Sequence, residues 1–196
     1  MKTKTLILIF LLFGLILNAQ DDISTKQSLR VGLNTAFFGS GDMTGLGLNI
    51  EYNYAINKYL SIAPRFMSAN ANGISDYPSF TNDFHQISSF GFSLSGKITP
   101  FPNNFKRLNI DLGGLYHKFT ETWGDIGSKD EYDTYSTNNT SYYEDNLFGF
   151  LGSLSFNVID SKKVVSGLRF DLLTSLYEGY LECDGFETGI YFGLKF

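Results

Sequence analysis

The residues of this chain that could carry nucleophilic or metal chemistry are two histidines, His85 and His117, and one cysteine, Cys183. Hydrolysis would need a nucleophile hydrogen-bonded to a base, and an acid that orients the base. His85 opens the run His-Gln-Ile-Ser and His117 opens His-Lys-Phe-Thr, so neither forms a His-x-Ser arrangement. Two histidines without a cysteine cluster give no zinc-ligand spacing. We therefore predict no catalytic, cofactor or metal site, and interpret Cys183, among acidic and small residues, as a loop thiol without chemistry.

A second set of candidate residues consists of charged side chains inside segments of alternating apolar residues. Alternation with a period of two is typical of a β-strand with one apolar face. The Lys, Arg, Asp and Glu residues in these segments all fall on the face opposite the apolar one, among Gly, Ala, Ser and Asn. Five are basic and three are acidic: Arg30, Glu51, Arg65, Lys97, Asp111, Arg169, Asp171 and Lys195.

Eight such segments must position these charges. They are predicted as strands over 29–37, 46–54, 60–66, 90–98, 108–116, 148–158, 168–176 and 189–196. The 20 glycines, 19 phenylalanines and 12 tyrosines, against four prolines, favour an aromatic, glycine-rich β protein. Pro64 cannot donate to a sheet ladder, so we expect a bulge or weak pairing there.

The connections between the segments alternate in length. Tight turns are predicted near 56–58, 100–106 and 159–163, whereas 39–43 is short and 69–86, 120–146 and 177–187 are longer. An outer-membrane barrel has short periplasmic turns and longer outer loops. This sorting therefore favours a membrane barrel over a soluble sandwich or a lipocalin-like barrel.

The beginning of the chain is typical of a secretory signal peptide. Lys2 and Lys4 precede an apolar run over 6–17, and Ala19 offers a small residue for cleavage. The run is shorter than the ~20 residues of a spanning helix. We predict a signal peptide over 1–19, with an uncleaved anchor as the alternative, and a short periplasmic segment over 20–26.

Periodicity alone fits both a soluble sheet with one wet face and a barrel with its apolar face outward. The apolar positions are mostly large, and the opposite positions are mostly small. Small side chains suit the narrow lumen of eight strands, and a basic charge facing mid-bilayer lipid costs about 2–4 kcal/mol. We predict an all-β fold: an eight-stranded antiparallel up-and-down transmembrane β-barrel over 27–196.

With these features the chain resembles the small OmpA/OmpX-type outer-membrane barrels over nearly all of its mature length. The resemblance implies a bacterial outer-membrane location. Longer relatives carry a periplasmic domain that is missing here, so we expect a bare barrel. The resemblance also implies that Phe192, Leu194 and Phe196 form a C-terminal sorting signal read by the barrel-assembly machinery. The alternative is that Phe196 only completes the lipid-facing girdle. Some barrels of this size are lipid-modifying enzymes, but the His-x-Ser arrangement of barrel deacylases is missing here.

The predicted lumen charges and outer loops suggest different functions. The charges either pair into a side-chain plug, which we favour, or line a translocation path. The outer connections contain Lys129 and fourteen acids: Asp42, Asp76, Asp83, Glu121, Asp125, Asp130, Glu131, Asp133, Glu144, Asp145, Glu178, Glu182, Asp184 and Glu187. They are either a solvated acidic surface or a site for cations that bridge to lipopolysaccharide. The negative charge of these connections disfavours nucleic-acid binding.

The 120–146 connection is rich in aromatic residues: Trp123, Tyr132, Tyr135, Tyr142 and Tyr143. Its second half reads as a hairpin around Asn138-Asn139 that continues two strands beyond the bilayer. This loop would either recruit an extracellular protein by strand addition or supply the outer aromatic girdle.

Together these features predict a non-enzymatic outer-membrane protein with a plugged lumen that acts in envelope structure, surface interaction or adhesion. Its partners would be outer-membrane lipid and lipopolysaccharide. A small low-conductance pore is the alternative, and a lipid-modifying barrel enzyme is a weaker one.

Overall fold

The computed structural model describes residues 26–38, 43–74, 83–102, 107–126, 137–177 and 180–196. The predicted signal peptide lies outside them, as does the 20–26 segment except for its last residue. Eight strands are formed: β1 (Gln27–Phe38), β2 (Met43–Ala55), β3 (Leu60–Ile74), β4 (Asp83–Ile98), β5 (Leu108–Ile126), β6 (Thr137–Asp160), β7 (Val164–Tyr177) and β8 (Tyr180–Lys195). None of the described residues forms a helix long and apolar enough to cross a membrane.

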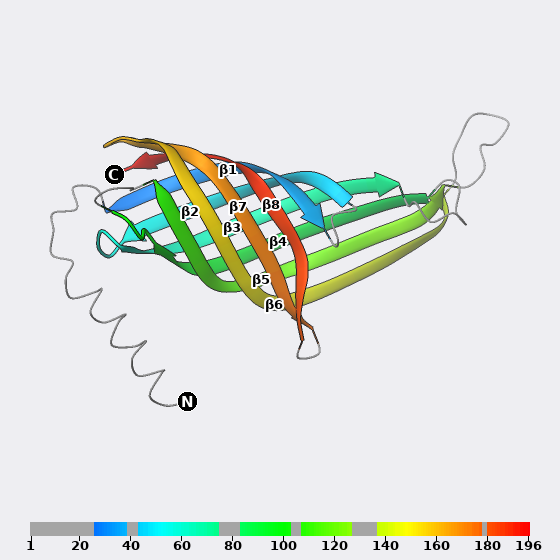
Figure 1. Ribbon diagram of the computed structural model, residues 1–196. Coiled ribbons are helices and arrows are strands. Elements are labelled where there is room, and N and C mark those ends of the chain that lie inside the picture. Colours follow the sequence, from blue (N-terminus) through cyan, green and yellow to red (C-terminus); the bar gives the residue numbers. More distant parts are fainter. Residues whose placement is uncertain (1–25, 39–42, 75–82, 103–106, 127–136, 178–179) are drawn as a thin grey trace, which may run out of the picture.

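The strands close into one barrel in chain order, and every neighbouring pair is antiparallel (Figure 1). β1 closes the sheet against β8, from Ser28 opposite Lys195 to Phe38 opposite Gly185. Closure satisfies the strand edges that an open sheet would expose. The predicted all-β, eight-stranded, up-and-down barrel is confirmed.

The outer surface of the barrel is an apolar belt. Because side chains alternate across a strand, the predicted apolar face of every strand points away from the lumen. Many of them are exposed: Leu29, Val31, Leu33, Leu46, Leu48, Ile50, Phe66, Phe90, Phe92, Leu94, Ile110, Leu112, Phe148, Phe150, Leu154, Val158, Leu168, Phe170, Ile190, Phe192 and Leu194. On β6 the belt runs from Val158 to Phe148, which matches the 9–11 residues of a tilted transmembrane strand.

The two ends of the barrel differ. The turn end carries both Gln27 and Phe196 and the short connections after β2, β4 and β6 (Figure 1). At the opposite end, here called the loop end, β3 to β6 extend well beyond the belt, and Figure 1 shows β5 and β6 reaching far past the ends of β7, β8 and β1. The length of the strands at this end corrects the predicted long loops, because most of 69–86, 120–146 and 177–187 is strand.

Two local predictions are also corrected, and a third agrees with the structure. Asn138-Asn139 lies inside β6, so the β5–β6 connection falls at 127–136 instead, outside the described residues. Cys183 is an exposed free thiol on β8, opposite Thr174 of β7, rather than a loop residue. The prediction for Pro64 is met by its second alternative: the β2–β3 register passes from Glu51↔Arg65 to Tyr54↔Ile62 without a shift, so the pairing is weak there and this part of the ladder has no bulge.

Candidate functional site

The lumen contains a network of buried charges centred on Arg65 of β3. Its Nε and Nη2 donate to Glu51 Oε2, at 3.1 and 2.8 Å. Nη2 also lies 3.0 Å from Asp111 Oδ2, and Nη1 donates to Asp171 Oδ1 at 2.9 Å and to Ser153 Oγ at 3.2 Å. Arg65 therefore joins β2, β5, β6 and β7 across the interior, so its rigid fork of donors serves several acceptors at once.

Glu51 of β2 is the second centre of the network. Arg169 Nη2 donates to its Oε2 at 2.5 Å, Arg30 Nη1 lies 3.4 Å from Oε1, and Lys97 Nζ also bonds Oε1. Lys97 lies 3.5 Å from Asp111 as well. Buried charges are tolerated only when they are paired, and here each carboxylate of the centre faces at least one cation.

Tyr191 of β8 lies beside this network. The guanidinium carbons of Arg30 and Arg169 lie 5.3 and 5.1 Å from the centroid of its ring, within cation–π range. Its hydroxyl bonds Asn157. Sequence reasoning missed this residue, although it has the same parity in β8 as Lys195.

Seven of the eight predicted lumen charges are buried inside the barrel, and all seven belong to this network. Lys195 does not join them. It pairs with Asp160 at the turn end, where the two side chains are 19% and 25% exposed.

An unpredicted charge, Glu187, is buried in the lumen instead. Asn34 Nδ2 donates to its Oε2 at 2.6 Å. The sequence pattern places Glu187 in an outer loop, because the eighth strand is predicted to begin at Gly189. Extending the alternation two residues upstream places Glu187 inside the barrel. With it, the buried charges of the described residues are four basic and four acidic, so the interior is formally neutral.

Towards the loop end, the lumen is filled by apolar side chains that the sequence reasoning did not assign to the interior. One cluster consists of Met67, Leu115, Leu151 and Leu173. The other consists of Ala36, Phe38, Met43, Ala69, Ala71 and Ile87, with Phe119 packed against it. They occupy the inward positions of their strands, so parity within each strand was the signal that would have found them.

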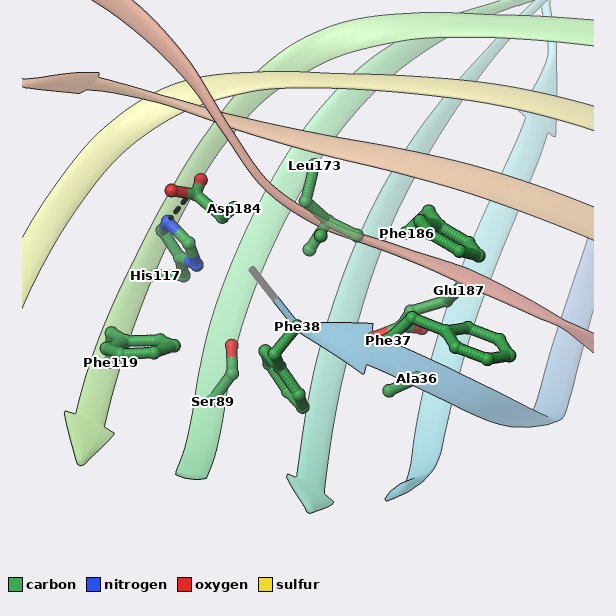
Figure 2. A pocket seen from close by; sticks show the side chains of 11 residues that line it. Ala36, Phe37, Phe38, Ser89, His117, Phe119, Leu173, Asp184, Phe186 and Glu187 are labelled. Carbon is green, nitrogen blue, oxygen red and sulfur yellow. Dashed lines mark ion pairs between the residues drawn. The ribbon is translucent and has the colours of Figure 1, made fainter. Parts of the chain in front are cut away.

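A cavity of about 10 Å³, enough for roughly one water, lies beside the second cluster (Figure 2). His117 of β5 borders it and holds two partners from other strands. Its Nε2 lies 2.7 Å from Ser175 Oγ of β7 and 3.3 Å from Asp184 Oδ2 of β8. Ser175 Oγ in turn donates to Asp184 Oδ2 at 2.5 Å.

This Ser–His–Asp cluster does not have the arrangement of a hydrolytic triad. In a triad the acid holds one ring nitrogen and the serine the other. Here Ser175 and Asp184 share Nε2, and the buried Nδ1 has no partner in the described part of the chain. The other histidine, His85, pairs with Glu121 near the loop end, with both side chains partly exposed. The cluster acts as a brace between β5, β7 and β8.

The protruding parts of β5 and β6 carry the predicted aromatic residues. Tyr142 and Tyr143 lie on β6 and are 62% and 42% exposed. Trp123 lies on β5, opposite Ser141, so these three are strand residues rather than loop residues. Tyr132 and Tyr135 fall outside the described residues.

Acidic side chains accompany these tyrosines. Tyr142 donates to Glu144, and Tyr143 Oη donates to Asp145 Oδ2 at 3.0 Å. Lys118 Nζ lies 2.7 Å from Glu144 Oε1. The hydrogen bonds from Lys118 and Tyr142 lower the pKa of the Glu144 carboxyl below its ordinary value, so this side chain stays ionised at neutral and mildly acidic pH.

The predicted C-terminal signal residues all lie on the outside of the barrel. Phe192, Leu194 and Phe196 are 56%, 55% and 61% exposed. Phe196 also joins the ladder, because its N–H and C=O bond the backbone of Gln27, at 3.0 and 3.2 Å.

No protein-family description matches this chain, and no curated protein matches it in sequence. Solved structures do resemble it. Ail, the attachment invasion locus protein of Yersinia pestis, is 10% identical with a TM-score of 0.52, over 87% of this chain and 97% of that one. OprG, an outer-membrane protein of Pseudomonas aeruginosa, is 12% identical with a TM-score of 0.53, over 88% and 96%.

A second structure of Ail, in complex with the heparin analogue sucrose octasulfate, is 10% identical with a TM-score of 0.50, over 86% and 98%. Identities this low establish the fold alone. A closed barrel with a continuous apolar outer belt is, in addition, the form in which β proteins cross a bilayer. The chain therefore has the fold of the small eight-stranded outer-membrane barrels, and it is an integral β-barrel of the bacterial outer membrane.

Proposed function

We propose that this protein is a non-enzymatic surface-interaction protein, in which a plugged barrel anchors the protruding β5–β6 hairpin outside the cell. The observation that carries the proposal is the length of β6. The strand has 24 residues, whereas crossing the bilayer takes about 9–11. The belt on β6 ends at Phe148, which leaves the stretch from Thr137 to Leu147 beyond the lipid.

The contents of the lumen support an anchor rather than the alternative low-conductance pore. An eight-stranded barrel is just wide enough for its own side chains. The charge network fills the interior, and the two apolar clusters lie between it and the loop end. An ion on this route would have to break buried ion pairs and then cross an apolar layer, and both steps are costly.

The position of the tyrosines supports a role in recognition. Tyr116 and Phe148, with ring centroids 5.0 Å apart, mark the upper rim of the belt on β5 and β6. Tyr142 lies six residues further along β6, about 20 Å of strand at 3.3 Å per residue. That distance favours a binding surface over the aromatic girdle for Tyr142 and Tyr143.

The charge of the hairpin indicates the kind of partner. Residues 118–148 contain seven carboxylates and two lysines. The heparin analogue in the Ail complex is a polyanion, and this hairpin would repel such a ligand. We propose a cationic protein surface as its extracellular partner, with the belt in contact with outer-membrane lipid and with lipopolysaccharide around the loop end.

A lipid-modifying activity is not part of the proposal, for a geometric reason. Lipid substrates approach from the belt, on the outside of the barrel. His117 and Ser175 point into the lumen, and both are buried. We propose no reaction at this cluster.

Truncating the hairpin tests the proposal. Replacing residues 120–144 with Asn-Gly joins β5 to β6 where Phe119 faces Asp145 and keeps the belt intact. Cells that express this variant at equal surface levels should bind less to immobilised cationic protein, with binding to anionic protein unchanged. Lys162→Gln, at the turn end, is the matched control. Undiminished binding by the truncated barrel would refute the proposed role of the hairpin.

We also propose that Phe192, Leu194 and Phe196 serve the barrel-assembly machinery as a sorting signal, supported by their outward exposure in one row. Phe196→Ala keeps the backbone bonds to Gln27 and removes only the ring. The variant should refold normally in detergent but accumulate in the periplasm of cells, and Phe196→Tyr should restore assembly. If Phe196→Ala reaches normal levels in the outer membrane, the Phe196 ring is part of the lipid-facing girdle and does not act as a sorting signal.

A further inference from the structure

Among the strands that the structure describes, β6 has a neighbour on only one side over its outer half. Its pairing with β5 continues to Asp125↔Asn139 and, after a register shift, Ile126↔Thr137. Its pairing with β7 begins only at Gly149↔Ser175. From Thr137 to Phe148, therefore, the far edge of β6 has no partner strand within the described part of the chain (Figure 1). We call this stretch the free edge.

The structure indicates which backbone groups the free edge presents. The Phe150 N–H donates to Thr174 Oγ1 at 3.3 Å, and the Phe150 carbonyl accepts from the same hydroxyl at 3.1 Å, so both groups face β7. Backbone groups alternate sides along a strand, and the β5–β6 register is unbroken over this stretch. The N–H and C=O groups of Tyr142, Glu144, Asn146 and Phe148 therefore face the free edge.

One hydrogen bond supports this assignment independently. The Asn146 N–H donates to Oδ1 of the neighbouring Asp145 at 2.7 Å. Asp145 thus covers a donor that a further strand would otherwise use. A strand on this edge would offer a carbonyl to Asn146 and release the Asp145 carboxylate for another partner.

The charges along the hairpin select what can occupy the edge. Open edges attract other strands, and charged residues are a common protection against unwanted pairing. A second copy of this chain would bring the same acidic hairpin alongside, and like charges on paired strands are destabilising. Glu144 and Asp145 are consecutive, so they project from opposite faces of β6. Lys or Arg side chains on either face of an incoming strand would meet a carboxylate.

We propose that the free edge of β6 binds an extended, basic segment of a partner protein by strand addition. The proposal rests on the proposed surface-interaction function and specifies its mode. Backbone bonds to Tyr142, Glu144 and Asn146 supply affinity, as in other complexes formed by β-augmentation. The carboxylates of Glu144 and Asp145 supply the selectivity for a cationic segment.

A labelled peptide of about ten residues with alternating Lys and Val provides the probe for strand addition. Its binding to the full chain in detergent micelles is measured by fluorescence anisotropy at physiological salt. The same peptide N-methylated at every third residue keeps its charge but loses donors on both edges, and should bind much more weakly. A Glu-Val peptide should not bind. Equal binding of the methylated and unmethylated Lys peptides would overturn strand addition and leave charge attraction alone.

Two variants of one residue separate the backbone of the edge from its side chain. Tyr142→Pro removes an N–H that faces the free edge and leaves the β5 ladder intact, whereas Tyr142→Ala removes only the side chain. The proline variant should bind the Lys-Val peptide about tenfold more weakly than the alanine variant, the loss expected for one hydrogen bond. Unheated mobility in SDS shows that both barrels are folded. Equal affinity of the two variants would overturn the proposal.

Two further outcomes would also overturn strand addition of a basic segment. If cells carrying Tyr142→Pro bind cationic protein as well as cells carrying Tyr142→Ala, the proposed function stands and strand addition is rejected. Dimers of the intact chain, detected by light scattering and abolished by Tyr142→Pro, would identify a second copy as the occupant and reject the basic segment.

Discussion

At the scale of single residues, the interior depends on Arg65, because one guanidinium group serves three carboxylates. Arg65 and the carboxylates of Glu51, Asp111 and Asp171 are fully buried. A buried ion pair contributes little net stability when compared with a well-packed apolar core, but removal of one partner leaves a charge without compensation. The cost of losing Arg65 should therefore far exceed the cost of losing a partly exposed charge.

We predict that Arg65→Met lowers the free energy of unfolding by about 3–5 kcal/mol. Lys195→Met, which removes the partly exposed pair with Asp160, should lower it by at most about 1 kcal/mol. Urea unfolding of the refolded barrels in detergent, followed by circular dichroism, measures both. Similar losses for the two variants would show that Arg65 is not the centre of the network.

At the scale of strands, two adjacent glycines of β5 have opposite surroundings. A Cβ on Gly113 would lie 2.3 Å from the Leu94 carbonyl oxygen and 2.5 Å from Ser95 Cα, so β4 would have to move. A Cβ on Gly114 would meet no described atom within 4 Å, because this position faces outward. Of these two adjacent glycines, only Gly113 is required by the close approach of β4 and β5.

We predict that Gly113→Ala destabilises the barrel by about 1–3 kcal/mol, as overpacking does. Gly114→Ala should be neutral or stabilising by up to about 1 kcal/mol, because it restricts the unfolded chain and adds a methyl group to the belt. The same urea titration compares the two neighbours. A destabilised Gly114→Ala variant would contradict the outward placement of this position.

At the scale of the whole molecule, the barrel has an apolar outside, buried lumen charges that formally balance and an apolar seal towards the loop end. This arrangement predicts a folded barrel that does not conduct. The protein should migrate differently in SDS before and after boiling, since the closed ladder resists detergent until heated. Planar bilayers that contain it should show no stable unitary steps. Steps that change with Arg65→Met would instead establish a water-filled path and favour the pore.

The sequence by itself determined the strand count, the antiparallel order and the face that each strand turns to lipid. Alternation is a local property with a period of two, and lipid penalises a charge on the wrong face, so the pattern is legible in each strand alone. Seven lumen charges, including Arg65 and Glu51, followed from the same parity. The ends of the strands could not be determined in this way, because beyond the bilayer both faces of a strand meet water. The alternation that marks a strand is therefore lost there.

Only the tertiary structure decided which side chains meet. Lys195 has the parity of the lumen charges but pairs with Asp160, because its height along the barrel places it at the turn end. Glu187, Tyr191 and His117 acquire partners from strands that lie far away in the chain and that the barrel brings together. The free edge of β6 likewise depends on where β7 ends relative to β6. Height and stagger arise from the register between strands, and a pattern within one strand does not contain them.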